Sequence, residues 1–353
     1  MNDLNLFLTY IFLCISLTYI ILKIFENISR YALDNKNKIQ KFHTTEAYRI
    51  GGFIIVFLIL INSYFFEIFG SFPIFFIFFL PILLISSIED LYQNTSVKLR
   101  LLAMSISSFL LVMHYEAHLS EVEISFVNTI LSIKYISIII STIGVVVTCN
   151  AWNFIDGLNG ISSGLGSFVL FLFYIISGDS NLEGLKEFLL LASATTFGIF
   201  LINIKTGKVF LGDTGSYLIG LLIGWSGLMI VTYNKEVSPW SIFLIIIYPA
   251  IEITFTVIRR IMLKKSPWLP DNLHLHSLIY RVFEKKLNIS KKIVNSLSGF
   301  FVLCLSIVPG LYYLSIDENF SKTIIAIFMY SIFYILLYFT FIFMLKFNNK
   351  IYN

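Results

Sequence analysis

Side chains that can bind phosphate or a metal ion gather in four short stretches of an otherwise apolar sequence. In the first, Glu89 and Asp90 end an apolar run shortly before Lys98 and Arg100. Two adjacent carboxylates can share a cation or raise each other's pKa, whereas the structural alternative is a solvated loop with weak ion pairs. This pair by itself supports both interpretations equally.

The second stretch, from Asn150 to Gly160, contains three Asn, one Asp and two Gly within eleven residues. Amides bind bases, riboses and sugar hydroxyls, and glycine lets backbone N–H groups approach a ligand. A simple link between two helices needs only one Gly and a cap. The density of polar groups at Asn150, Asn153, Asp156 and Asn159 therefore favours a binding site.

The third stretch places Asp213 between two glycines, directly before an apolar segment. An ordinary helix N-cap is one interpretation, because Asp and the following Thr are good capping residues. The other is a hard oxygen ligand for Mg²⁺ beside the free N–H groups of a helix start, which suits phosphate.

The fourth stretch is a basic loop, residues 259–281, that carries His274 and His276 two positions apart. A zinc site is disfavoured, because no thiolate or third histidine lies nearby and the surrounding Lys and Arg repel a cation. Phosphate binding fits better, since Arg and protonated His bind anionic oxygens. Contact with lipid headgroups would explain the basic residues but not the histidine pair.

The rest of the chain predicts a membrane protein. Hydrophobic residues make up 57% of the sequence and charged residues only 13%, against about 25% charged in soluble domains. Apolar runs of about 20 residues suit helices that cross a bilayer. We therefore expect one all-α, polytopic helical bundle over residues 1–353, with about eleven transmembrane helices near 5–25, 51–69, 72–88, 99–114, 130–149, 160–178, 185–203, 215–232, 239–258, 295–315 and 323–345.

The positions of Lys and Arg predict the orientation of this bundle. With the N-terminus outside and the C-terminus in the cytoplasm, 21 of the 25 basic residues fall on the cytoplasmic side. The first segment has no basic residues before it and no small-residue cleavage pattern after it, so we expect a retained anchor. On this topology the cytoplasmic face collects the unusual polar residues: Glu89, Asp90, Asn150, Asn153, Asp156, Asn159, Asp213, Glu252, Asp271, His274 and His276.

The four stretches, in this order, resemble the polyprenyl-phosphate N-acetylhexosamine-1-phosphate transferases, the membrane family that includes phospho-N-acetylmuramoyl-pentapeptide transferase. The resemblance runs roughly from Arg49 to Arg281. The usual Asp-Asp pair is Glu89-Asp90 here, Asn159 stands where many members have Asp, and Ser277 replaces the last His of a His-x-His-His motif. The sequence is more similar to the branch that makes lipid-linked precursors of surface polysaccharides than to the peptidoglycan branch.

The resemblance implies that a polyprenyl phosphate attacks a UDP-N-acetylhexosamine at the inner face of the bacterial plasma membrane. The products would be UMP and a lipid-linked sugar that initiates O-antigen, capsule or other envelope polysaccharide. Mg²⁺ is the expected cofactor, with Mn²⁺ as an alternative. A homodimer is expected, and a nucleic-acid partner is not. The implied site residues are Glu89, Asp90, Asp156, His274 and His276 for catalysis, Asp213 and Asn153 for the metal, and Arg49, Lys98, Arg100, Asn150, Asn153, Asn159 and Arg281 for the substrates.

Three other functions stay open at this stage. Within the same family, the chain could transfer phospho-N-acetylmuramoyl-pentapeptide. A multi-span transporter or flippase also has acidic residues in its membrane segments, but carriers place charges near the midplane and often show duplicated halves. A scaffold protein would leave the Asn, Gly and His loops without a purpose.

Overall fold

The computed structural model describes residues 3–28, 32–34, 46–65, 72–178, 184–266, 271–316 and 319–346. Within them the only β structure is two isolated bridges, which join Tyr48 to Leu33 and to Val209. The predicted all-α class is therefore confirmed. The helices are α1 (Asp3–Ile28), α2 (Gly51–Phe65), α3 (Phe72–Tyr92), α4 (Val97–His114), α5 (Ser125–Leu131), α6 (Lys134–Ile155), α7 (Ile161–Ile176), α8 (Leu185–Thr206), α9 (Gly212–Tyr233), α10 (Pro239–Ile245), α11 (Ile247–Met262), α12 (Leu275–Lys286), α13 (Lys291–Tyr313) and α14 (Phe320–Lys346).

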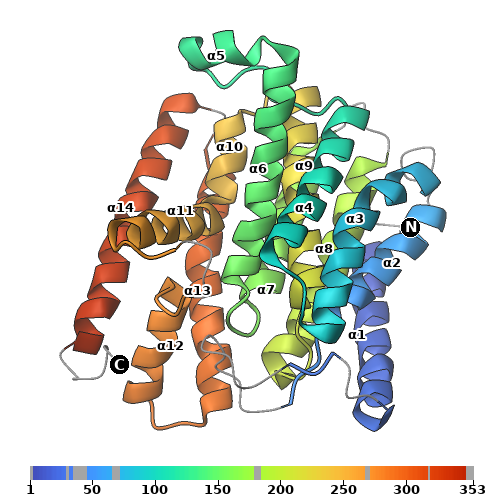
Figure 1. Cartoon of the computed structure of the whole chain (residues 1–353), viewed down its shortest axis with the longest axis vertical. Coiled ribbons are helices and arrows are strands. Elements are labelled where there is room, and N and C mark those ends of the chain that lie inside the picture. The colour runs from blue at the N-terminus through green and yellow to red at the C-terminus, as the bar shows by residue number, and fades with distance from the viewer. Residues whose placement is uncertain are drawn as a thin grey trace.

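Within the described residues, seven helices are long and apolar enough to cross a membrane: α1, α4, α6, α8, α9, α13 and α14. Most of them run side by side along the long axis of the molecule (Figure 1). The protein is thus a polytopic membrane bundle, as the sequence predicts. Helices α2 and α7 are apolar but shorter, so the count of eleven spans is not confirmed.

The segment predicted as a span over 239–258 is not one continuous helix. The structure divides this segment into α10 and α11, which are bent by 79° relative to each other. Pro249 explains the break, because it has no N–H for the carbonyl of Ile245 and its ring would clash with that carbonyl in a continuous helix. Helix α11 therefore crosses the bundle instead of following its long axis (Figure 1).

The packing of the central helices brings several helix ends together. Helix α6 packs against α9, α7 against α8, and α3 against α4. The carboxyl ends of α3 and α6 and the amino ends of α4 and α9 meet at one end of the bundle, where bonds link Asp90 to Asp213 and Asn153 to Ser216. The first three polar stretches lie at these ends, and the histidine stretch before α12 lines the same cavity, so the fold gathers residues that are more than 180 positions apart in sequence.

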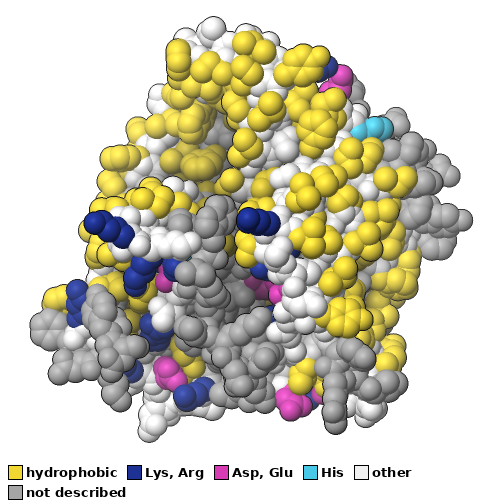
Figure 2. Space-filling model, viewed as in Figure 1, with side chains coloured by type: hydrophobic (Ala, Val, Ile, Leu, Met, Phe, Trp, Pro, Cys, Tyr) yellow, Lys and Arg dark blue, Asp and Glu magenta, His cyan; other side chains and the backbone are white. Residues whose placement is uncertain are grey.

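The surface is divided in the same way. Figure 2 shows hydrophobic side chains over most of the upper part of this face, whereas Lys, Arg, Asp and Glu are concentrated in the lower part around a hollow. Many of the exposed apolar side chains belong to helices that could face lipid, for example Phe328 and Leu336 on α14. The charged end and the apolar belt suit a protein whose polar loops stand at one membrane surface.

Candidate active site

A cavity of about 860 Å³ opens among α4, α6, α9, α11 and the loop before α12. It brings together ten of the thirteen predicted site residues: Arg49, Glu89, Arg100, Asn150, Asn153, Asp156, Asn159, Asp213, His274 and His276. The remaining three, Asp90, Lys98 and Arg281, do not line it. Lys98 is exposed to solvent, two residues from Arg100 on the same helix.

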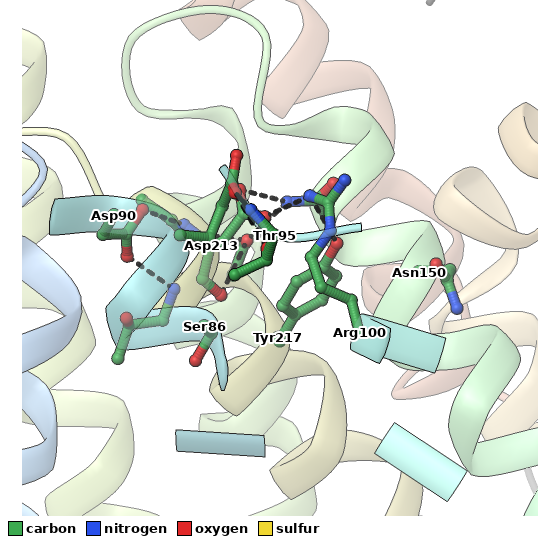
Figure 3. Close-up of polar contacts among 12 residues, drawn as sticks. Ser86, Asp90, Thr95, Arg100, Asn150, Asp213 and Tyr217 are labelled. Carbon is green, nitrogen blue, oxygen red and sulfur yellow. Dashed lines mark hydrogen bonds and ion pairs between the residues drawn. The ribbon is translucent and has the colours of Figure 1, made fainter. Parts of the chain in front are cut away.

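Asp90 connects α3 to the start of α9. Its two carboxylate oxygens accept hydrogen bonds from the backbone N–H groups of Asp213 and Thr214, each at 2.8 Å (Figure 3). Gly212 has a φ of 69°, and a Cβ there would lie 2.5 Å from the Asp90 carboxylate, so only glycine allows this approach. Asp90 therefore acts as the cap of α9, a role that the sequence analysis assigned to Asp213 as one of its two alternatives.

Glu89 differs from Asp90 in facing the cavity. Its Oε2 accepts hydrogen bonds from the backbone N–H and the hydroxyl of Thr95, both at 2.8 Å. Across the same wall, Arg49 is held by Asp34, with 2.7 Å between Nε and Oδ1. The geometry thus leaves Glu89, rather than Asp90, as the member of the acidic pair that a ligand in the cavity can reach.

Asp213 is bonded through both of its carboxylate oxygens. Its Oδ2 accepts a hydrogen bond of 2.6 Å from Arg100, and its Oδ1 accepts one of 3.3 Å from the amide of Asn153 (Figure 3). The same amide nitrogen also donates to Ser216, at 3.0 Å. The carboxylate, which belongs to α9, is thus held by one side chain from α4 and one from α6.

Asp156 follows the last residue of α6 and stands at the cavity wall. Its carboxylate accepts no hydrogen bond from the described residues. Burial, together with the nearby charges of Asp213 and Asp90, raises the pKa of this group to about 8. The positive charge of Arg49 offsets only part of this effect.

The asparagines of the 150–160 stretch divide into two kinds. Asn150 donates to the carbonyl of Val146, within its own helix. Asn159 is buried, with its N–H bonded to Asn295 and its amide bonded to Ser296, both on α13. Asn159 thus ties the loop after α6 to α13, while its remaining surface lines the cavity.

The loop before α12 is anchored to α11 by Asp271. Its carboxylate accepts a hydrogen bond from Arg259. It also forms an ion pair with Arg260, with 3.6 Å between the guanidinium nitrogen and Oδ1. Although burial opposes ionisation, the bond from Arg259 lowers the pKa of Asp271. These arginines hold the loop that carries the histidines, a structural role that the sequence does not reveal.

The two histidine rings lie parallel, with 5.3 Å between their centroids and 3° between their planes. Burial lowers the pKa of His276 to about 3, so this ring is neutral at physiological pH. His274 instead faces a carboxylate: its Nδ1 lies 3.0 Å from Oε1 of Glu252. The sequence predicts the same role for both histidines, but their surroundings in the structure differ.

Gly157 determines where His276 can lie. A Cβ at position 157 would be 2.2 Å from Nε2 of His276, which no real contact permits. We expect Gly157→Ala to displace the ring, to destabilise the protein by about 1–3 kcal/mol and to lower activity. Thermal unfolding in detergent measures the first effect. The matched control is Gly144→Ala on α6, where a Cβ meets nothing within 4 Å, and equal melting shifts in the two variants would contradict this assignment.

Sequence reasoning missed three residues of the site. Glu252 was noted as an unusual polar residue but received no role, although a carboxylate inside an apolar helix is a recognised sign of function. Tyr217 lies 3.5 Å from Arg100, and Asn203 accepts a 2.5 Å bond from the N–H of Gly160. Tyr and Asn within apolar helices are ordinary, so no sequence signal distinguishes these two.

Fold and site together define a polytopic membrane protein whose cavity is lined by carboxylates, amides and arginines. Comparison with known proteins agrees: residues 72–231 match the family described as Glycosyl transferase family 4. The resemblance stated from the motifs is thereby confirmed. The matched range contains the first three polar stretches and ends before the histidine loop.

Individual relatives align with this chain over only part of their own length. An undecaprenyl-phosphate alpha-N-acetylglucosaminyl 1-phosphate transferase of Thermotoga maritima is 28% identical over 60% of this chain and 62% of its own. A probable undecaprenyl-phosphate N-acetylglucosaminyl 1-phosphate transferase of Bacillus subtilis is 27% identical over 55% and 54%. A decaprenyl-phosphate N-acetylglucosaminephosphotransferase of Mycolicibacterium smegmatis is 27% identical over 44% and 43%. The alignments thus cover less than two thirds of each relative.

Proposed function

We propose that this protein transfers an N-acetylhexosamine 1-phosphate from a UDP-sugar to a polyprenyl phosphate and releases UMP. An oxygen of the lipid phosphate would attack the sugar-bearing phosphorus, and the bond from that phosphorus to UMP would break. The names of the relatives favour N-acetylglucosamine as the sugar. The lipid-linked product would initiate an envelope polysaccharide such as O-antigen or capsule.

The composition of the cavity carries this proposal. Its lining includes the charged groups Arg49, Arg100, Asp156 and Asp213. It also includes apolar side chains from three helices: Val97, Leu101, Met104, Val146, Val147, Ile253, Val257 and Ile261. A polyprenyl phosphate combines the same two kinds of surface, since its phosphate is anionic and its chain is hydrocarbon. A cavity for water-soluble substrates only would not need the apolar part.

Cations are the main requirement of the proposed reaction. Two unit charges about 4 Å apart repel by about 4 kcal/mol at an effective dielectric of 20, which is about a thousandfold in rate. Arg49 and Arg100 supply fixed positive charge at the cavity wall. They would hold phosphate oxygens, while Glu89 is the better placed of the acidic pair to accept the last proton of the lipid phosphate.

A divalent ion fits the donor set. Asp156 has no hydrogen-bond partner among the described residues, its pKa is raised to about 8, and Asp213 lies close enough to contribute to that shift. Oxygen donors of this kind suit Mg²⁺ and, as an alternative, Mn²⁺. Asp213 and Asp156 would hold the ion, which would neutralise charge on the pyrophosphate. Asn153 turns its amide nitrogen toward Asp213 and would have to present its oxygen to join them.

The proposed topology follows from the concentration of charged side chains at one end of the protein. Helices α2, α3 and α7 and the bent α10–α11 pair, counted with the seven long helices, would make eleven crossings of the plasma membrane. The N-terminus would lie outside and the site would face the cytoplasm, where UDP-sugars are made. A homodimer remains part of the proposal.

Release of labelled UMP tests the function directly. We expect the purified chain to release UMP from UDP-N-acetylglucosamine only when polyprenyl phosphate and Mg²⁺ are both present, and EDTA to abolish the release. A panel of UDP-sugars, including UDP-N-acetylmuramoyl-pentapeptide, would separate this activity from the peptidoglycan branch. Movement of a lipid-linked sugar across liposomes without any UMP release would instead favour a flippase and refute the transferase.

A further inference from the structure

Glu252 is a carboxylate completely buried in α11, and nothing in the proposed reaction yet uses it. A buried carboxylate is costly unless hydrogen bonds and a positive partner compensate. Here Oε1 lies 3.0 Å from Nδ1 of His274 and accepts a second bond, of 3.3 Å, from the N–H of Leu275. Oε2 accepts a bond of 2.9 Å from the hydroxyl of Tyr334 on α14. Both oxygens are therefore committed.

The His274 ring is fixed by more than this bond. Its Nδ1 also lies 3.4 Å from the hydroxyl of Thr256, one turn along α11 from Glu252. Phe154 meets the ring edge to face, with 5.5 Å between centroids, and His276 stacks parallel to it. With Nδ1 occupied by Glu252, Nε2 is the ring nitrogen that remains for a ligand in the cavity that His274 lines.

We propose that Glu252 is a positioning residue, which accepts a hydrogen bond from Nδ1 of His274 and thereby presents Nε2 of that ring to a phosphoryl oxygen of the substrates. This inference rests on the proposed function. When the ring carries a proton on each nitrogen, Nδ1–H donates to the carboxylate and Nε2–H donates to an anionic oxygen. His276 has no such carboxylate and stays neutral, so the two histidines contribute differently.

The break between α10 and α11 gives this arrangement a structural origin. Because the bend turns α11 across the bundle, α11 contacts both the loop before α12 and α14 through Glu252. Glu252 can then contact His274 on one side and Tyr334 on the other. A straight helix over 239–258 would follow the bundle axis and would not lie across these two elements.

The isosteric variant Glu252→Gln tests the proposal in full-length protein. We expect kcat for UMP release to fall by about 10- to 100-fold, as is typical when the partner that orients a functional histidine is lost. The KM for the UDP-sugar should change less than about threefold, since the ring acts most strongly on the transition state. The melting temperature should stay within about 2 °C of wild type. Glu187→Gln, an exposed acid on α8, is the matched charge control.

A double-mutant cycle distinguishes positioning from a merely structural role. If Glu252 acts through His274, Glu252→Gln should change kcat less than about threefold in a His274→Gln background. Effects that multiply in the double variant, or full activity of Glu252→Gln, would overturn the proposal. If Glu252→Gln does not fold, Glu252→Asp serves in the same cycle, because it keeps the charge but withdraws it by about one carbon–carbon bond.

A measurement without turnover separates this inference from the proposed function. In ¹⁵N spectra of histidine-labelled protein, with His274→Gln as the assignment control, we expect a proton on Nδ1 of His274 in wild type and its loss in Glu252→Gln. A wild-type ring protonated only on Nε2 would refute the pairing. If the pairing is observed but no UDP-sugar yields UMP, the transferase assignment fails and the Glu252–His274 contact stands.

Discussion

Asp213→Asn is expected to lower kcat for UMP release by about a thousandfold and to raise the Mg²⁺ concentration that supports half-maximal rate. The substitution removes the negative charge but keeps the shape of the side chain. Asp213 is fixed by Arg100 on one oxygen and by Asn153 on the other, and it borders Asp156. Under the proposed function, losing its charge weakens a metal ligand and also weakens the bond from Arg100, which becomes a bond to a neutral amide oxygen.

Steady-state rates at several Mg²⁺ concentrations would measure both effects in one experiment. The exposed Glu187→Gln is again the matched control, because it makes the same charge change on α8 far from the cavity. Near-normal turnover of Asp213→Asn with an unchanged Mg²⁺ requirement would remove Asp213 from the metal site.

The grouping of polar stretches could be predicted because membrane topology is a strong constraint. Apolar segments of fixed length alternate sides, so stretches at Asp90, Asp156, Asp213 and His274 had to share one face if the basic residues were placed correctly. The structure brings ten of the thirteen residues to one cavity. The sequence therefore carried enough information to predict that most of these residues meet.

Roles within the site could not be predicted, because they depend on contacts between helices. Glu89 and Asp90 are neighbours in sequence, yet one faces the cavity and the other caps α9. Successive residues of a helix point about 100° apart, so their destinations depend on which helix packs beside them. The same reason applies to Lys98 and Arg100, of which only Arg100 reaches the cavity.

The bend at Ile246 is the feature of the fold that the sequence analysis does not predict. The segment 239–258 is apolar throughout most of its length, and a Pro near its middle is tolerated in many membrane helices. The chain breaks here because Pro249 leaves the carbonyl of Ile245 without its helical donor, while α13 and α14 pack around the broken pair. Hydropathy reports only that a segment is apolar, so it cannot distinguish a crossing helix from a bent one.

Substitution of Arg100 is expected to have the second large effect on activity. It is the only described basic side chain that bonds to Asp213, at 2.6 Å, and its guanidinium also reaches to 3.5 Å from Tyr217. A group that orients a metal-binding carboxylate and also faces anionic substrates serves two purposes at once. We expect Arg100→Gln to lower kcat/KM by about a hundredfold to a thousandfold.

Arg100→Lys would show whether charge or geometry matters more. A lysine keeps the positive charge but has one nitrogen instead of a planar fork, so it cannot both hold Asp213 and donate to a phosphate in the same geometry. We expect it to recover less than about a tenth of wild-type kcat/KM. The control is Lys205→Gln, an exposed base at the end of α8. If Arg100→Lys were fully active, a positive charge at this position would be sufficient for catalysis. Activity would then not depend on the geometry of the Arg100–Asp213 bond.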